Sequence, residues 1–431
     1  MSSNNNQKYT WVKGQLPPKI DSHSIIKHRI VNDYLRNYIK TLMAQPQIPR
    51  LKMTIIDGFA GGGHYLSDGD RYLEGSPLIM MKAIKDARQF LNIDREKERI
   101  LDVDFYFNDL DISCIEYLRE LIVLYAGGDE IEQSDLLRVN YSAENFTLFA
   151  TRLINKFVAD NQMGRYIFVL DQYNYMDVPF NIIKQIFKFL PKSEVILTFN
   201  VGALTTFLSD CPSSRKPLQE IGLDKYLPWD VLQSLREQDK KQWRTLIQTC
   251  LAQGMREESQ VAYMTPFFVR PNNSSPWDYW LVHLSNHYRA HDVMKKLHWL
   301  HGNKFGHQLS PGYFTYGYSA KDGLLVSGSS LFEFNNREQC VEGIAEHIDK
   351  TLFELRGPVT IGKLLQNNIV NSAGDESHFQ DSFQLLHQEK QIVVMSANGK
   401  KRRVSKRYRP DDIVRSTPRQ LRLDFVDKRT T

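Results

Sequence analysis

The chain has 431 residues, of which 42% are hydrophobic and 24% charged, and this composition predicts a globular protein of one to three domains. A net charge of only +5 identifies no partner by itself. No run of eighteen apolar residues is present, which excludes an obvious transmembrane helix, and the polar start MSSNNNQKYTW lacks the apolar centre of a secretory signal.

The cysteines and the first twenty residues complete this outline. Cys114, Cys211, Cys250 and Cys340 are scattered and form no CxxC pair, so we expect neither a zinc site nor a disulfide framework. A reducing, cytoplasmic setting fits that pattern best. Residues 1–20 are predicted to be a flexible arm.

Strands and helices then alternate along the chain. Apolar residues recur at helical spacing over 21–44, and a strand is expected at 51–57. Ser76 and Pro77 carry the chemistry of a helix start. Further strands are expected at 103–109, 130–134, 166–171 and 194–201, with helices at 112–125, 143–158 and 178–190 between them. This alternation predicts an α/β fold with a doubly wound, Rossmann-like parallel sheet.

The pattern changes after this sheet. Residues 204–258 are charged and helical in character and predict a helical insertion. Two aromatic runs flank the segment PNNSSP, which predicts a C-terminal antiparallel hairpin, followed by a helix at 288–300. We expect one domain over residues 21–335.

Residues 338–413 are predicted to form a small separate domain, and 414–431 a tail. Three helical segments precede two strands around Asn398-Gly399, the dipeptide of a tight hairpin, which predicts a winged-helix-like domain. Seven of the ten residues from 400 to 409 are basic, namely Lys400, Lys401, Arg402, Arg403, Lys406, Arg407 and Arg409. This basic loop suits a polyanion such as nucleic acid; a solvated hairpin or a protein contact is the alternative.

The segment Asp57-Gly58-Phe59-Ala60-Gly61-Gly62-Gly63 follows the first strand, at the sheet edge where doubly wound folds bind ligands. Glycines let the backbone approach a ligand closely. Leu66 stands where the dinucleotide fingerprint needs a third glycine, and no Gly-Lys-Ser/Thr follows. The segment resembles motif I of class I S-adenosylmethionine-dependent methyltransferases, in the form common among nucleic-acid methyltransferases. The resemblance implies that Asp57, Phe59, Gly61 and Gly63 hold S-adenosylmethionine.

The ends of the next strands agree with this interpretation. Asp109, with Asp111 as the alternative, would bind the ribose hydroxyls. Asp135 follows the expected third strand, where a side chain would meet the adenine amino group. Lys27, on the first helix, is expected to reach the methionine carboxylate.

The segment Asp171-Gln172-Tyr173-Asn174 follows the fourth strand, where amino-methyltransferases carry Asp/Asn-Pro-Pro-aromatic. In that motif the acid or amide and a backbone carbonyl hold the target amine, and the aromatic ring stacks on a base. Asp171, Tyr173 and Asn174 are therefore the candidate catalytic residues. Gln172 departs from the motif.

The order of these segments also resembles the three-Cys-motif partner proteins. HSIIKHRIVNDYLRNYI, IIDGFAGGGHY, EGSPL, FNDLD, DQYN and WLVHLSNHYRAHDVMKKLHW carry the resemblance over about residues 20–310. The family is prokaryotic, is encoded beside a protein with three cysteines, and occurs in mobile-element or phage-related settings. The resemblance implies such a partner protein. The family usually has Asp-Pro-aromatic-Gly where this chain has residues 171–174.

Two functions remain open. His287 and His291 are spaced i, i+4, but His298 is too far along the helix for one ion, so we expect packing or a substrate groove and no metal site. Either the chain is a methyltransferase acting on DNA or RNA, or it is a non-catalytic adaptor that keeps the fold and partners the three-cysteine protein. The retained acids and glycines favour the first, and Gln172 favours the second.

Overall fold

The computed structural model describes residues 9–161, 164–269, 279–305, 309–310, 313–314, 336–355 and 357–417. Contacts divide the chain into two compact units, 1–308 with 315–332, and 309–314 with 333–431. The tail predicted from residue 414 is wrong at its start, because residues 414–416 belong to strand β14 (Ile413–Ser416); the part beyond residue 417 lies outside the described residues. None of the helices in the described ranges has the length and apolar character that a membrane span requires.

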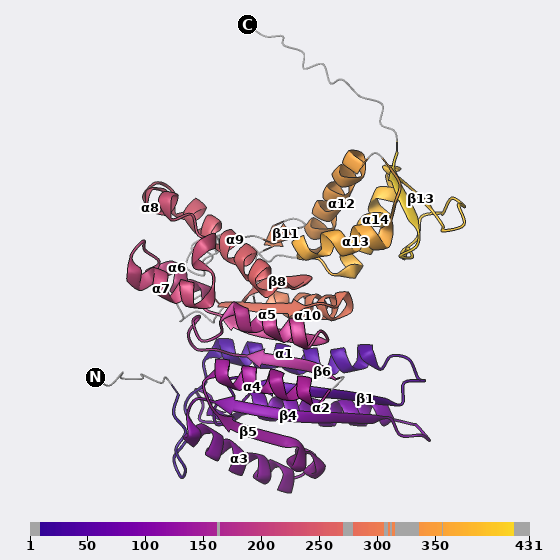
Figure 1. The fold of residues 1–431 in the computed structure, drawn as a ribbon. Coiled ribbons are helices and arrows are strands. Elements are labelled where there is room, and N and C mark those ends of the chain that lie inside the picture. The colour runs from indigo at the N-terminus through magenta and orange to yellow at the C-terminus, as the bar shows by residue number, and fades with distance from the viewer. Residues whose placement is uncertain are drawn as a thin grey trace. The chain divides into compact units, whose positions relative to one another are not determined.

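A seven-stranded sheet forms the centre of the first unit (Figure 1). Its order is β5-β4-β1-β6-β7-β9-β8, with bounds Val139–Ala143, Ile100–Asp109, Arg50–Asp57, Arg165–Leu170, Ser193–Phe199, Tyr279–Ser285 and Tyr263–Val269. The first five of these strands run parallel, and β9 is antiparallel to both of its neighbours. The predicted Rossmann-like sheet and its C-terminal antiparallel hairpin are therefore confirmed.

Two helical layers enclose this sheet (Figure 1). In one layer α1 (Ser22–Leu42) packs against α2 (Ser76–Asn92) and α10 (Tyr288–Phe305). In the other, α5 (Phe180–Phe189) packs against α4 (Phe146–Ala159) and α9 (Lys240–Ser259). The strands β6 and β7 are buried at almost every position, and β1 is buried from Met53 to Asp57, as expected for parallel strands that are covered on both faces.

The remaining elements of the first unit surround this core. Helix α3 (Ile112–Gly127) begins at Asp111, whose carboxylate caps it by accepting from the Ser113 N–H at 2.9 Å. The short strands β2 (His64–Leu66) and β3 (Tyr72–Glu74) form a hairpin after the glycines. The predicted helical insertion consists of α6 (Val201–Phe207), α7 (Pro212–Ile221), α8 (Trp229–Gln238) and α9.

Two expectations for the first unit are wrong. Residues 9–20 are not a loose arm, because Trp11 is buried and the segment is hydrogen-bonded to β2. The strand expected at 130–134 is not there: Gln133–Arg138 is a 3-10 helix, and the edge strand β5 follows it at Val139–Ala143. That strand is half-exposed throughout and carries little apolar signal, which explains the misplacement.

The second unit holds three helices and a three-stranded antiparallel sheet. The helices are α12 (Asn336–Leu355), α13 (Ile361–Asn368) and α14 (Glu376–Gln388); the sheet order is β12-β14-β13, with bounds Val359–Thr360, Ile413–Ser416 and Ile392–Met395. The expected tight turn around Gly399 is present, because the Gly399 N–H donates to the Ser396 carbonyl at 2.8 Å and Met395 forms an antiparallel bridge with Lys401. The second expected strand does not extend beyond this bridge, and β13 pairs along its length with β14 instead. The winged-helix interpretation stays a prediction.

Candidate functional site

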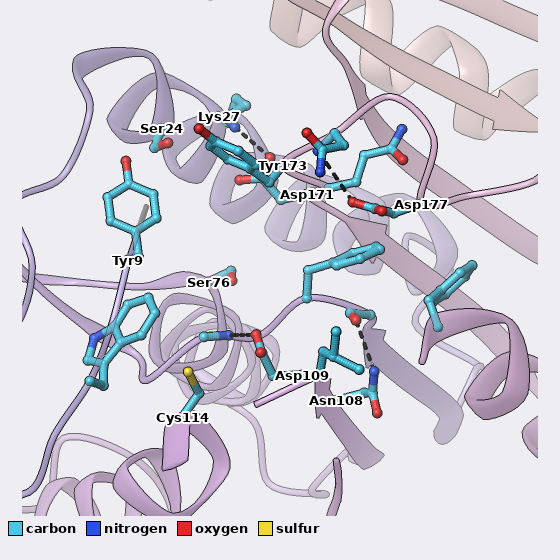
Figure 2. A pocket seen from close by; sticks show the side chains of 18 of the residues that line it. Tyr9, Ser24, Lys27, Ser76, Asn108, Asp109, Cys114, Asp171, Tyr173 and Asp177 are labelled. Atoms are coloured by element: carbon cyan, nitrogen blue, oxygen red, sulfur yellow. Dashed lines mark hydrogen bonds and ion pairs between the residues drawn. The ribbon is translucent and has the colours of Figure 1, made fainter. Parts of the chain in front are cut away.

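A cavity of about 560 Å³ lies at the carboxyl ends of the central strands of the first unit (Figure 2). Its volume is within the range of small-molecule sites, about 300–1,000 Å³. The ends of β1, β4, β5 and β6 all contribute to its wall, together with α1 and the N-terminal segment. Among the residues predicted from sequence, it is lined by Lys27, Phe59, Gly61, Asp109, Asp171, Tyr173 and Asn174.

The glycine turn after β1 is fixed by Asp57. The Asp57 carboxylate is fully buried and accepts from the Ser76 hydroxyl at 2.6 Å and from the Phe59 N–H at 3.1 Å. Burial raises the pKa of Asp57 to about 7. Asp57 does not line the cavity, so the structure places it as a support beneath the turn.

The glycines have several different neighbours. Gly61 and Gly63 have φ values of +56° and +80°, a region that favours glycine. Gly61 lines the cavity, whereas a Cβ on Gly63 would lie 2.6 Å from Leu118 of α3. A Cβ on Gly62 would lie 2.3 Å from the Trp11 indole. We expected these glycines to admit a ligand; at residues 62 and 63 the close neighbours are the protein's own side chains.

Asp109, at the end of β4, is positioned by the turn. Its carboxylate accepts from the N–H groups of Gly61, at 2.9 Å, and Asp111, at 3.0 Å. Burial raises the pKa of Asp109 even though these donors oppose the shift. The alternative ribose ligand Asp111 caps α3 and is not part of the cavity wall.

Asn108 was missed by the sequence analysis. Its amide donates to the carbonyl oxygens of Gly58, at 3.2 Å, and Glu144, at 3.0 Å, and its Oδ1 accepts from the Glu144 N–H at 3.2 Å. One buried side chain thus ties together the loops that follow β1, β4 and β5. Its neighbour Asp109 was the stronger signal, because a carboxylate at that place suggested a ribose ligand.

The predicted adenine contact at Asp135 is wrong in position. Asp135 is buried in the 3-10 helix before β5 and pairs with Arg88 through two hydrogen bonds of 2.6 and 2.8 Å. Glu144, Asn145 and Phe146, which follow the true β5, line the cavity instead. The Phe146 ring stacks on Phe59, with ring centroids 5.5 Å apart.

Lys27 contacts the candidate catalytic acid. Its ammonium group lies 2.5 Å from the Asp171 carboxylate (Figure 2), and Lys27 is buried while about a quarter of the Asp171 side chain is exposed. Burial alone would raise the pKa of Asp171, but the Lys27 ammonium group outweighs burial and lowers it. We expected Lys27 to bind the methionine carboxylate of the ligand. In the structure its partner is instead a carboxylate of the protein, that of Asp171.

The segment after Asp171 forms the other wall of the cavity. Gln172 points into the core, where its amide donates to the Thr198 carbonyl at 3.0 Å and accepts from the Val178 N–H at 3.0 Å. Tyr173 is half-exposed, and the Asn174 N–H donates to Asp177 at 3.3 Å. Burial raises the pKa of Asp177, a cavity residue that sequence reasoning missed.

The histidines of α10 are packed in the first unit. His291 is buried and lies 3.1 Å from the Thr265 hydroxyl, and His298 stacks on Phe267. In the described parts of the chain, no three His, Cys, Asp or Glu side chains are grouped as a metal site. The metal alternative therefore has no support from these residues.

The predicted basic loop connects β13 to β14 in the second unit. Six of its seven cationic side chains are exposed, and Arg402 pairs with Asp412 at 2.8 Å. Tyr408 anchors the loop: it is buried, and its hydroxyl contacts His387 Nδ1 at 2.9 Å. The loop thus has a fixed base and exposed charges.

Comparisons with known proteins give limited likenesses. A scan against protein-family models and a search of curated proteins gave no match. Among solved structures, spermidine synthase from Thermotoga maritima is 13% identical, with a TM-score of 0.27 over 74% of each chain. PKMT2 from Rickettsia typhi, in complex with AdoHcy, is 12% identical, with a TM-score of 0.26 over 87% of this chain and 74% of that one.

The fold class therefore depends on the sheet itself. Five parallel strands, followed by a hairpin whose antiparallel strand β9 lies between β7 and β8, resemble Rossmann-like methyltransferase folds. The comparisons give no evidence for the three-Cys-motif partner family, and that resemblance stays a prediction.

Proposed function

We propose that the chain is an S-adenosylmethionine-dependent methyltransferase that modifies an amino group of DNA or RNA. The observation that carries this proposal is a single cavity that joins the glycine turn and Asp109 to Asp171 and Tyr173. The glycine turn and Asp109 suit a nucleoside that carries an amino-acid group. Asp171 and Tyr173 suit an amine presented on an aromatic base.

The donor would occupy the end of the cavity at β1, β4 and β5. Asp109 is held at the strand end where an acid binds ribose hydroxyls. Phe59 and Phe146 offer ring faces for the adenine, beside the polar groups of Glu144 and Asn145. The cavity has the volume for such a ligand.

The acceptor would lie against residues 171–177. When bound, S-adenosylmethionine supplies a methyl carbon whose bond to sulfur breaks as the acceptor nitrogen's lone pair bonds to it, with the C–S electron pair returning to sulfur. Asp171, kept ionised by Lys27, accepts a hydrogen bond from the amine and so aims its lone pair. Tyr173 stacks on the base. Asp177, which faces the same cavity, takes the proton that the nitrogen then loses.

The basic loop of the second unit supports nucleic acid as the acceptor. Exposed Lys400, Lys401, Arg403, Lys406, Arg407 and Arg409 offer six cations for backbone phosphates. Affinity that depends on such contacts falls steeply with salt. We therefore expect binding to DNA or RNA to weaken as salt rises, and to weaken further when Lys400 and Lys401 are replaced by glutamate.

Methyl transfer from labelled S-adenosylmethionine to DNA and to RNA tests the proposal. Transfer should be lost in Asp171→Ala and kept in a matched variant of an exposed acid away from the cavity, Asp68→Ala. Binding of the donor by calorimetry should persist in Asp171→Ala, because that residue belongs to the acceptor side. Absence of transfer to both nucleic acids, with donor binding intact, would contradict the nucleic-acid acceptor.

A second candidate function is the non-catalytic adaptor in a prokaryotic mobile-element setting. Two observations favour it: the Lys27 ammonium group already neutralises Asp171, and the Gln172 amide is committed to the core. In that case the cavity would bind a nucleotide-like ligand, and the partner would be a three-cysteine-motif protein. Donor binding without transfer, combined with a stable complex with such a partner, would favour the adaptor.

A further inference from the structure

The N-terminal segment is fastened across the glycine turn. The Trp11 indole N–H donates to the His64 carbonyl at 2.7 Å, and the side chain is only 4% exposed. Further along, the Ile20 N–H donates to the Leu66 carbonyl at 2.9 Å, and the Leu66 N–H donates to the Pro18 carbonyl at 2.9 Å. Because the segment is held at both places, its side chains have defined positions at the cavity.

Three aromatic rings meet where this segment crosses the cavity. Ring centroids are 6.1 Å apart for Tyr9 and Trp11, 5.6 Å for Tyr9 and Tyr65, and 5.3 Å for Trp11 and Tyr65. All three residues line the cavity beside Gly61. A Cβ at Gly61 would lie 2.9 Å from the indole, so the missing side chain makes room for Trp11. We call Tyr9, Trp11 and Tyr65 the aromatic wall.

The aromatic wall lines the same cavity as Asp109 and Asp171. Burial raises the pKa of Tyr65, and the carboxylates of Asp171, Asp57 and Asp109 raise it further. The Tyr9 hydroxyl donates to Asp21 at 2.6 Å, which turns another carboxylate toward the wall. A ligand in this cavity therefore has both the rings and the carboxylates on its walls.

The charge around the wall is negative. Five carboxylates line the described part of the cavity, those of Asp21, Asp109, Glu144, Asp171 and Asp177. Lys27 is the lysine among the lining residues, and it is paired with Asp171. Burial lowers the pKa of His28 to about 4, so that side chain is neutral at pH 7. Negative potential and π faces together favour a cation.

We infer that the aromatic wall recognises the positive sulfonium of the methyl donor and so makes the chain prefer S-adenosylmethionine to the neutral product S-adenosylhomocysteine. This inference rests on the proposed function. It adds a preference between two ligands, the donor and its demethylated product, that the fold alone does not supply. Donor and product share the adenosyl and amino-acid groups, so contacts with Asp109 or Phe59 do not separate them. The charge on sulfur does, because the cation–π attraction disappears when the methyl group leaves.

Calorimetry with three ligands tests the aromatic wall. The probes are S-adenosylmethionine, S-adenosylhomocysteine and an analogue with a protonated amine in place of the sulfonium. The wild-type chain should bind both cationic ligands about 3-fold to 30-fold more tightly than the thioether, the range given by a partly or fully desolvated cation–π contact. The same preference should appear for both cations, since the charge and not the methyl group is recognised.

Matched variants separate the ring from the volume that it fills. Tyr65→Phe keeps the π face and should keep the preference, whereas Tyr65→Leu should reduce it by at least about 3-fold with little change in thioether binding. Trp11→Phe and Trp11→Leu give the same comparison at the second ring. Tyr72→Leu is the control, because Tyr72 is exposed on the adjacent β3 and is not part of the cavity wall.

Three outcomes would overturn the inference in distinguishable ways. If the leucine variants weaken all three ligands equally, the rings only pack, and the proposed function survives. If the wild type binds donor and thioether equally, the wall does not read charge, and again the function survives. If the wild type binds none of the three, the proposed function fails with it. Thermal unfolding verifies that each variant is folded. If Trp11→Leu is not folded, the comparison of Tyr65→Phe with Tyr65→Leu decides the test.

Discussion

The two halves of the cavity are built in different ways. On the proposed donor side, backbone N–H groups of the glycine turn bond to the end of β4: the Ala60 N–H donates to the Asn108 carbonyl at 2.8 Å, and the Gly61 N–H to the Asp109 carboxylate at 2.9 Å. On the acceptor side, the critical contacts are between side chains or across distant segments, as with Lys27 and Asp171, 144 residues apart. The donor half is therefore specified by short sequence motifs, whereas the acceptor half depends on the completed fold.

The largest expected effect concerns the support under the donor half. The raised pKa of Asp57, about 7, means that its contribution to stability is full below its unfolded value of about 3.9 and is lost as pH rises through 7. Between pH 4 and pH 8, the unfolding free energy of the wild type should therefore fall by about 4 kcal/mol more than that of Asp57→Asn. This figure follows from about 1.4 kcal/mol per pKa unit. Urea unfolding at several pH values measures this. Parallel pH curves would contradict it.

Breaking the acceptor-side ion pair comes next. Lys27→Met leaves the Asp171 carboxylate without its partner and should cost about 2–3 kcal/mol, less than a fully buried pair because Asp171 is partly exposed. Adding Asp171→Asn should recover at least half of that loss. The stability from the lowered Asp171 pKa is present above about pH 4 and disappears as pH falls through the folded value, so the defect should shrink in acid.

An exposed pair provides the control for Lys27. Lys13 contacts Glu120 at the same 2.5 Å, but both side chains are mostly exposed. Lys13→Met should cost much less than Lys27→Met in urea unfolding, because solvent screens an exposed pair. Equal losses of unfolding free energy in Lys27→Met and Lys13→Met would show that burial does not make the Lys27 ion pair more important than the exposed one.

Removing Asp109, the proposed ribose ligand, should affect binding more than folding. Asp109→Ala is expected to weaken S-adenosylmethionine about 10-fold to 150-fold, the range for losing charge-assisted hydrogen bonds. Asp111→Ala, two residues on, removes the α3 cap and should cost about 1 kcal/mol of stability while keeping donor affinity. Calorimetry and thermal unfolding on both variants give the comparison. Equal donor affinities for the two variants would sink the assignment of Asp109.

Among the residues that line the cavity, the smallest expected effect is at Gln172, which braces the proposed acceptor half. Gln172→Ala leaves the Thr198 carbonyl and the Val178 N–H without their partner and should cost about 1–2 kcal/mol in urea unfolding. Donor affinity should stay within 2-fold of the wild type, because no donor-side contact changes. Weaker donor binding in this variant would show that the two halves are coupled.

The difference between the halves also explains what the sequence predicted. The glycines directly follow β1, and Asp109 is the last residue of β4. The proposed donor side was therefore predictable from short motifs, apart from β5. That strand is at the sheet edge, where VNYSA lacks the apolar run of a buried strand, and Asp135 was assigned in its place. The turn and Asp109 were predicted, while the supporting role of Asn108 depends on three loops that meet only in the fold.

Contacts across long separations were not predictable in this way. Lys27 was correctly placed at the cavity but assigned to the wrong carboxylate, because nothing near residue 27 in the sequence indicates Asp171. Trp11 was not predicted as a buried residue, because it lies in a polar N-terminal segment. Its partners Gly61 and Gly62 are about fifty residues away, and the absence of side chains there was attributed to a ligand. The basic loop was predicted from composition, but its anchoring by Tyr408 and His387 required the structure.

The place of β9 in the sheet has a consequence for synthesis of the chain. Strand β9 is made after both β7 and β8 yet lies between them, paired antiparallel with each. Until residues 279–285 leave the ribosome, β7 and β8 both expose an unpaired edge, and such edges promote aggregation. A chain cut just before residue 279 would thus have a sheet that ends at β7 and a β8 segment with no strand to pair with, and that fragment should need a chaperone to stay in solution.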